Sequence, residues 1–204
     1  MSTFLRTTAL STGGARTLER ADYVSADVFA AEHARIFARE WLCVGREDVI
    51  AGPGQYVLFE VGPDNLIVVR DRSGTVRALH NTCRHRGTRL CDAPCGELSE
   101  TIQCPYHAWT YGLDGRLLGV PDAREMEDFD RADYPLKQAA VALWEGFVFV
   151  NLAEEPEPFA EVYAPLISRF GRWNLGALRA ARRIDYDVQA NWKILFQNYS
   201  ECYH

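Results

Sequence analysis

The chain has 204 residues, of which 48% are hydrophobic and 25% are charged, the balance of a globular protein. Its formal net charge of −6 argues against nucleic acid as the main partner, because phosphate binding needs a basic surface. No run of about eighteen apolar residues is present, and the N-terminus lacks the apolar core of a signal peptide. We therefore expect a cytoplasmic protein that neither binds nucleic acid nor spans a membrane.

The first predicted element is a helix over residues 25–41, with Ser25 as its N-cap. Its apolar residues recur near helical spacing: Val28, Phe29, Ile36 and Phe37. Downstream, short apolar runs alternate with turns rich in Gly, Pro and Asp, which predicts a small antiparallel β domain. The predicted strands lie within residues 41–46, 55–61, 65–71, 75–81, 101–106 and 146–152.

The polar segment 153–158 contains two prolines and is the predicted linker. Beyond it, the pattern predicts a helix over 159–170, a strand over 183–188 and a helix over 191–204. The predicted domain organisation is therefore an N-terminal tail and helix (1–40), a β domain (41–152) and the start of a second domain (159–204).

Two short motifs combine cysteine with histidine. Cys83 and His85 form a C-x-H box, and Cys104 and His107 form a C-x-x-H box. Each box follows a predicted strand, so both can lie on loops at one end of the β domain. Two thiolates and two imidazoles are ligands either for zinc or for a Rieske iron–sulfur cluster. The C-x₂₋₄-C spacing of typical zinc fingers is absent from these boxes, which favours the cluster.

The residues around both boxes, CRHRG (83–87) and CPYHAWTY (104–111), resemble the ligand loops of the Rieske [2Fe-2S] domain. The resemblance implies a mainly β fold in which the cysteines hold one iron and the histidines the other. Rieske proteins of respiratory complexes join their two loops by a disulfide, and its second cysteine would fall at Tyr106. The resemblance therefore leaves Cys91 as a free thiol. It points to the lower-potential Rieske proteins that serve oxygenases or act as ferredoxins.

The other conspicuous residues have two interpretations each. Cys91 and Cys95 could form a second metal site, but we favour small residues packed beside a ligand loop. Tyr106 and Trp109 either pack over the cluster and limit the access of water, or are ordinary core aromatics. Cys43 lies in an apolar strand, so we expect it in the core.

The last residues place Asn198, Glu201 and His204 at positions i, i+3 and i+6, along one side of the predicted helix. With the two boxes upstream, the segment ANWKILFQNYSECYH (190–204) resembles the start of the catalytic domain in the alpha subunits of Rieske non-haem iron oxygenases. That domain is α+β, and its remaining iron ligands would follow residue 204, so we expect only its truncated start here.

The resemblance assigns roles to these three residues. His204 would be a ligand of a mononuclear Fe(II), held by the family's two histidines and one carboxylate. Glu201 would join His107 of one subunit to His204 of its neighbour in a homotrimer. Asn198 would be a supporting hydrogen-bonding residue near the iron.

The function implied by the resemblance is an oxygenase. Electrons from an NAD(P)H-dependent reductase, directly or through a ferredoxin, would pass from the [2Fe-2S] cluster to the Fe(II). The iron would activate O₂ for hydroxylation or oxidative demethylation of a small organic substrate. Aromatic-ring dioxygenases have Asp at the position of Glu201. A Glu here resembles the branch of the family that acts on carnitine or glycine betaine. The alternative is a Rieske ferredoxin without an oxygenase site, which would lack the 190–204 segment.

Overall fold

The structure is a computed structural model that describes residues 17–121, 128–182 and 184–200. These residues form two compact units. One unit combines the described residues up to Glu32 with those from Ile184 onward, and the other takes the described residues between them.

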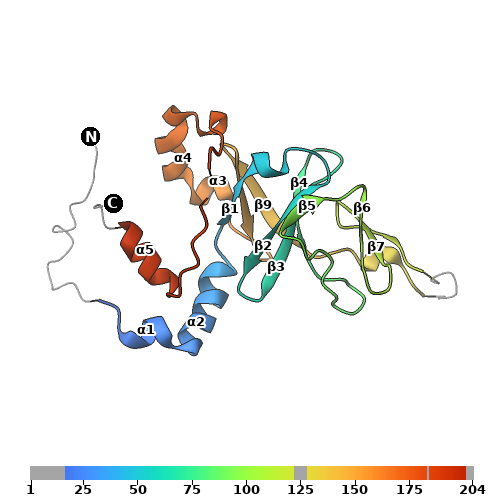
Figure 1. Ribbon diagram of the computed structural model, residues 1–204, viewed down its shortest axis with the longest axis horizontal. Helices are drawn as coiled ribbons and strands as arrows, with labels where there is room; N and C mark the ends of the chain where they lie inside the picture. The colour runs from blue at the N-terminus through green and yellow to red at the C-terminus, as the bar shows by residue number, and fades with distance from the viewer. Residues whose placement is uncertain (1–16, 122–127, 183, 201–204) are drawn as a thin grey trace. The chain divides into compact units, whose positions relative to one another are not determined.

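The central unit is built on two antiparallel sheets (Figure 1). The larger sheet has the strand order β1 (Leu42–Arg46), β10 (Phe147–Asn151), β9 (Gln138–Trp144), β4 (Val76–His80), β3 (Asp64–Arg70), β2 (Gln55–Val61) and β5 (Cys95–Glu97). The smaller sheet contains β6 (Thr101–Gln103), β7 (Thr110–Gly112) and β8 (Leu117–Gly119). This confirms the mainly β fold, and every predicted run contains a strand.

Strand β3 explains how the larger sheet is buried. Its residues Leu66, Ile67, Val68 and Val69 are all at most 1% exposed. Leu66 and Val68 pack into one hydrophobic cluster, whereas Ile67 and Val69 pack into another, because successive side chains point to opposite faces. An uninterrupted apolar run is what a strand covered on both faces requires. The cluster under Ile67 also contains the cysteines of both ligand motifs.

Two short helices, α3 (Phe159–Val162) and α4 (Ala164–Phe170), follow the predicted linker and lie beside β1 in Figure 1. Phe159 packs on Trp41 and Phe149, with ring centroids 5.6 and 4.7 Å away. The linker itself has no regular structure but is fixed, because Trp41 Nε1 donates a hydrogen bond to the Glu157 carbonyl (2.9 Å). Single 3₁₀ turns occur at Glu47–Ile50, Arg131–Asp133, Gly171–Trp173 and Leu175–Ala177.

The N-terminal helical segment differs from the prediction. Ser25 separates helix α1 (Arg20–Val24) from helix α2 (Ala26–Glu32). Its hydroxyl accepts a hydrogen bond from Val28 N (3.4 Å) and so caps the N-terminus of α2. A π-helical turn, His33–Phe37, follows α2. The cap at Ser25 is therefore confirmed, but the single helix reaching residue 41 is wrong.

Helix α5 (Trp192–Ser200) lies within the helix predicted for 191–204. Asn191 caps it, since its Oδ1 accepts a hydrogen bond from Lys193 N (3.0 Å). Glu32 of α2 accepts hydrogen bonds from Lys193 Nζ and from Trp192 Nε1, and these bonds lower the pKa of Glu32. The N-terminal helices and α5 are thereby joined into one unit.

Two further predictions are wrong. Residues 184–188 form no strand, because no other strand in the described residues pairs with them. Cys43 is exposed rather than buried. It lies on β1, which has β10 as its one neighbour in the sheet, and the pairing is irregular between Cys43 and Gly45.

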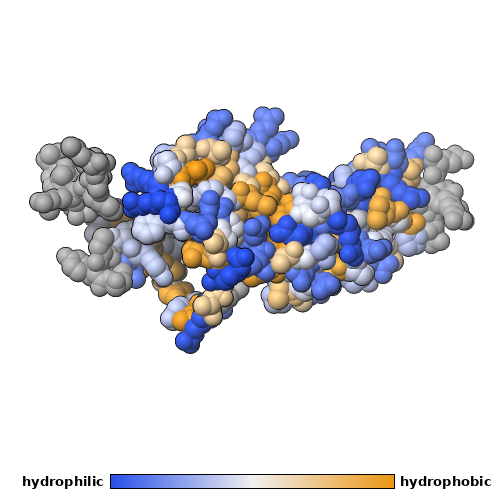
Figure 2. All heavy atoms as spheres, turned by 90° about the horizontal axis from the view of Figure 1, so that it is seen from above, coloured by the Kyte–Doolittle hydropathy of each residue, from blue (hydrophilic) through white to orange (hydrophobic). Residues whose placement is uncertain are grey.

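The surface carries hydrophobic patches among hydrophilic residues on the face drawn in Figure 2. Large hydrophobic side chains are exposed along much of the segment between Phe170 and Tyr199, among them Trp173 and Phe196. None of the helices in the described part of the chain has the length and apolarity needed to cross a bilayer.

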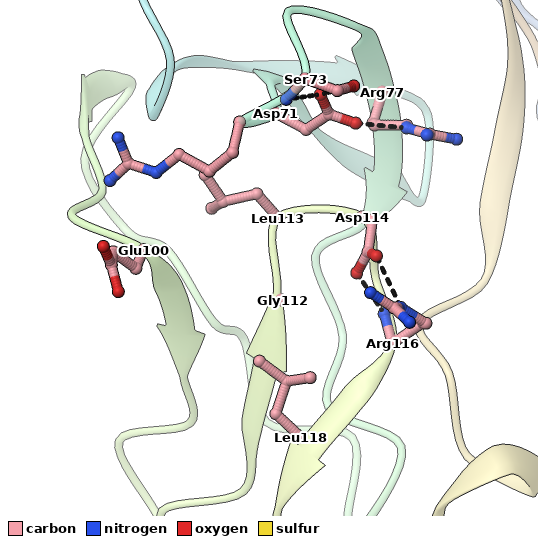
Figure 3. Close-up of a pocket in the computed structure, with 10 residues that line it drawn as sticks. Asp71, Ser73, Arg77, Glu100, Gly112, Leu113, Asp114, Arg116 and Leu118 are labelled. Atoms are coloured by element: carbon pink, nitrogen blue, oxygen red, sulfur yellow. Dashed lines mark hydrogen bonds and ion pairs between the residues drawn. The ribbon is translucent and has the colours of Figure 1, made fainter.

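The turn between β3 and β4 is organised by one buried carboxylate. Asp71, 4% exposed, accepts hydrogen bonds from Ser73 N (2.8 Å), Thr75 N (3.0 Å) and Arg77 Nε (2.9 Å), and Figure 3 draws its bonds to Ser73 and Arg77. Burial alone would raise the pKa of Asp71, but the bonds from Ser73, Arg77 and Thr75 hold that pKa below its usual range. The ionised form is thus the one that stabilises the turn.

We expect Asp71→Asn to lower the free energy of unfolding at pH 7 by about 2 kcal/mol, because the charge-assisted bond to Arg77 is lost. The pKa of Asp71 is lower in the folded than in the unfolded state. The stabilisation by ionised Asp71 is therefore fully present above pH ~4, and it is lost as the pH falls through the folded-state pKa. Urea unfolding at several pH values should therefore show the wild-type and variant curves converging below pH ~4. A difference that stays constant down to pH ~2 would contradict this.

Candidate functional site

Cys83 and Cys104 begin two loops that have the same backbone hydrogen bonds. In each loop the cysteine carbonyl accepts a bond from the N–H four residues later, and the cysteine N–H donates to the carbonyl five residues later. The partners are Gly87 N (3.0 Å) and Thr88 O (2.8 Å) in the first loop, and Ala108 N (3.1 Å) and Trp109 O (2.8 Å) in the second. The residue four positions after the cysteine has positive φ in both loops, 73° at Gly87 and 55° at Ala108.

A non-glycine residue at positive φ is uncommon, so the conformation of Ala108 must be held by its surroundings. The two bonds of its loop do this. The two loops are therefore structural equivalents, although histidine stands two residues after the cysteine in one and three in the other.

The thiols and the imidazoles of these loops have different surroundings. Cys83 and Cys104 are each 3% exposed, whereas His85 and His107 are exposed. The two imidazole rings lie side by side, with centroids 4.8 Å apart. The two cysteines thus lie in one hydrophobic cluster inside the domain, and the two imidazoles lie together at its surface.

This donor set fits a two-iron cluster. Within the described residues, no three or more His, Cys, Asp or Glu side chains are grouped so that they could hold one metal ion. A single zinc ion would need such a group, whereas each iron of a Rieske cluster takes two protein ligands. The pKa of His85 is lowered, mainly by partial desolvation of its ring and to a smaller extent by the nearby charges of His107 and Arg86. Neutral imidazole, the form that binds metal, is favoured as a result.

Aromatic rings pack on both imidazoles. Trp109 stacks on His85 with centroids 4.9 Å apart and an interplanar angle of 7°, and Trp109 is 7% exposed. Tyr106 stacks on His107 at 3.7 Å but is 62% exposed. Trp109 belongs to the hydrophobic core, which confirms it as a core aromatic, and it also contacts a predicted ligand; Tyr106 covers His107 from the solvent side.

Tyr111 is a site residue that sequence reasoning missed. It is fully buried, and its hydroxyl lies 3.3 Å from Cys83 Sγ. The same oxygen accepts a hydrogen bond from Arg84 N (3.0 Å), which leaves the phenolic hydrogen free to point at the sulfur. Burial, together with Cys83, raises the pKa of Tyr111 well above its usual range, so the phenol stays a donor. The signal was available, since a tyrosine closes the second ligand box, but its partner lies in the other loop.

The remaining cysteines show no metal site in the described part of the chain. Cys91 is buried and unbridged, which confirms it as a free thiol, and burial raises its pKa. Cys95 is exposed on β5. Cys91 belongs to the hydrophobic cluster that also holds Cys83 and Cys104, as expected for a residue packed beside a ligand loop.

The second predicted constellation is described in part. Asn198 lies on α5 and is exposed. Glu201 and His204 lie outside the described residues.

A pocket of about 420 Å³ opens between the β3–β4 turn and the smaller sheet (Figure 3). Its aspartates are paired within the chain, Asp71 with Arg77 and Asp114 with Arg116 (2.6 Å). None of the four predicted cluster ligands lines it. The candidate metal centre is therefore at the two cysteine loops and not in this pocket.

Comparison with known proteins gives the same assignment. Residues 40–135 match the Rieske [2Fe-2S] domain, and residues 175–204 match the catalytic domain of the ring hydroxylating alpha subunit. The chain is 41% identical to the glycine betaine monooxygenase oxygenase subunit of Chromohalobacter salexigens, over 94% of this chain and 42% of that protein. It is 33% identical to the carnitine monooxygenase oxygenase subunit of Acinetobacter baumannii, over 92% of this chain and 51% of that protein.

The fold also matches a solved structure. The crystal structure of the apo form of a quaternary ammonium Rieske monooxygenase, CntA, has a TM-score of 0.86 and 33% identity, covering 92% of this chain and 55% of that chain. Residues 40–135 are thus a Rieske [2Fe-2S] domain. More particularly, they are followed by a segment similar to the start of the catalytic domain of the ring hydroxylating alpha subunits, and the chain spans about half the length of the curated relatives it matches.

We expect Tyr111→Phe to lower the reduction potential of the cluster, because a hydrogen bond to a ligand sulfur stabilises the more negative, reduced state. The loss of one such bond should shift the potential by on the order of 50 mV. A redox titration followed by EPR measures it, and Tyr134→Phe, a substitution at an aromatic residue that contacts Trp109, is the control. An unchanged potential in Tyr111→Phe would show that the hydroxyl does not act on the cluster.

Proposed function

We propose that Cys83, His85, Cys104 and His107 hold a [2Fe-2S] cluster in the oxygenase subunit of a monooxygenase that acts on a small quaternary ammonium compound. The observation that carries the proposal is the pair of equivalent loops with buried thiols and exposed imidazoles. The 41% identity to a glycine betaine monooxygenase subunit supports the class of substrate.

The proposed cluster site has a buried side, formed by the thiols, and an exposed side, formed by the imidazoles. A bound [2Fe-2S] cluster supplies one-electron transfer. The buried thiols of Cys83 and Cys104 keep the inner side of the site away from water, while Tyr111 offers a hydrogen bond to Cys83. The exposed His85 and His107 place the outer side where an electron can enter or leave. Trp109, stacked on His85, covers one face of the imidazole ring from water.

The proposal extends to the start of the catalytic domain. We propose that His204 is a ligand of a mononuclear Fe(II), that Glu201 joins His107 of one subunit to His204 of the next in a homotrimer, and that Asn198 supports the iron site. Exposed hydrophobic side chains between Phe170 and Tyr199 fit a segment that packs against more protein than these residues contain. An NAD(P)H-dependent reductase, directly or through a ferredoxin, would supply electrons for O₂-dependent oxidation of the substrate.

The test is to purify the full-length gene product and to measure its iron, its acid-labile sulfide and its O₂ consumption with NADH and a matched reductase. Glycine betaine, carnitine and benzoate are supplied in turn. We expect two-iron cluster content, and O₂ consumption dependent on one of the quaternary ammonium compounds. A protein that carries the cluster but consumes no O₂ with any of them would instead be an electron carrier of the ferredoxin type.

We expect Glu201→Gln to leave the iron–sulfur content and EPR spectrum unchanged and to lower kcat by about 10–100-fold, the usual cost of losing a carboxylate that orients metal-bound imidazoles. Steady-state O₂ consumption measures kcat, and Glu161→Gln, at an exposed position on α3, is the control. Equal turnover in both variants would remove Glu201 from the electron path.

A further inference from the structure

Asn81 lies directly between strand β4 and the Cys83 loop, and it is 2% exposed. Its side-chain amide makes four hydrogen bonds. Nδ2 donates to Asn65 Oδ1 (2.7 Å) and to the Cys91 carbonyl (2.7 Å), and Oδ1 accepts from Leu90 N (3.0 Å) and Cys91 N (2.8 Å).

These four bonds use the whole capacity of an amide, which has two N–H donors and two acceptor sites on oxygen. An aspartate has the same shape but no donor when it is ionised. It would turn an oxygen toward Asn65 Oδ1 and the Cys91 carbonyl, so buried acceptors would face one another. The position therefore specifies asparagine.

The bonds of Asn81 belong to a closed circuit. Asn65 Nδ2 donates to Glu60 Oε1 (2.6 Å), and Arg89 Nη2 donates to the same oxygen (2.9 Å). Arg89 Nε donates to the Cys91 carbonyl (3.1 Å), which also accepts from Asn81. We call Glu60, Asn65, Asn81, Arg89 and the Cys91 carbonyl the polar ring. It connects both ends of segment 81–91 to the β2–β3 hairpin.

The two ligand loops are closed by different means. The Cys104 loop connects β6 to β7, which pair with each other up to Gln103 and Thr110, so strand hydrogen bonds close it. The Cys83 loop follows β4, and the next strand, β5, pairs with β2. One isolated bridge, between Thr82 and Arg89, links the two sides of this loop. The polar ring supplies the closure that strand pairing gives to the other loop.

We propose that the polar ring, through Asn81, positions the Cys83–His85 loop. The ring holds this loop closed and so slows the release of iron from the cluster. The inference rests on the proposed ligand set. It goes beyond it by assigning a role to residues that do not contact the iron. The ring is made entirely of protein groups, so it acts before as well as after the cluster is present.

The test compares Asn81→Asp with Asn151→Asp in the full-length protein. Asn151, the last residue of β10, is a matched control. It is 1% exposed, donates to the Arg39 carbonyl (2.8 Å) and accepts from Ala153 N (2.8 Å), and neither partner belongs to the polar ring. Iron release to a coloured Fe(II) chelator and the EPR spectrum of the reduced cluster are measured. We expect release to be about tenfold faster in Asn81→Asp, with broadened EPR lines, and unchanged in Asn151→Asp.

A second variant keeps the proposal testable if Asn81→Asp does not fold. The Glu60 side chain is 62% exposed, so Glu60→Ala removes one member of the ring without disturbing the core. We expect about threefold faster iron release, since the anchors of Asn65 and Arg89 are lost at the surface. Wild-type release rates in Glu60→Ala, or in a folded Asn81→Asp, would overturn the role of the ring. A wild-type protein without a two-iron cluster would overturn the proposed function itself.

Discussion

The structure depends on one constraint, which is that two cysteine thiols are buried while the histidines of the same loops stay exposed. Cys83 and Cys104 reach the inside because they belong to the hydrophobic cluster formed with Ile67, Val69 and Leu79 of the larger sheet. Their loops then turn outward, and the positive φ of Gly87 and Ala108 brings the chain back toward the next strand or bend. A cluster between such loops has a shielded side and an accessible side.

The two loops reach this common geometry from different supports. The second loop is the end of a hairpin, so the pairing of its two strands closes it. The Cys83 loop is followed by a segment that leads to β5, which pairs with β2 and not with β4. Side-chain hydrogen bonds, above all those of Asn81, therefore close this loop in place of strand pairing. Polar groups that are buried and fully paired give a single, specific arrangement, which is what a metal site requires of its surroundings.

The β domain, and the position of both Cys–His boxes on loops that follow strands, could be predicted from the sequence, because the apolar runs and the C-x-H and C-x-x-H spacings are local signals. Tyr111 and Asn81 were not recognised, since their roles depend on partners in other loops and strands. Cys43 looked like a core residue because an apolar strand does not show that it lies at a sheet edge. The alternation at 183–188 was misleading, as a strand forms where a partner strand exists, and the described residues offer none.

The most direct test of the central claim is pulsed EPR of the reduced protein, which detects nitrogen nuclei bonded to the cluster. The account predicts couplings to two imidazole nitrogens, with one of them lost in His85→Cys and in His107→Cys. A cluster that shows no nitrogen coupling, or a protein that binds one zinc ion in place of the cluster, would contradict the assignment of Cys83, His85, Cys104 and His107 as its ligands.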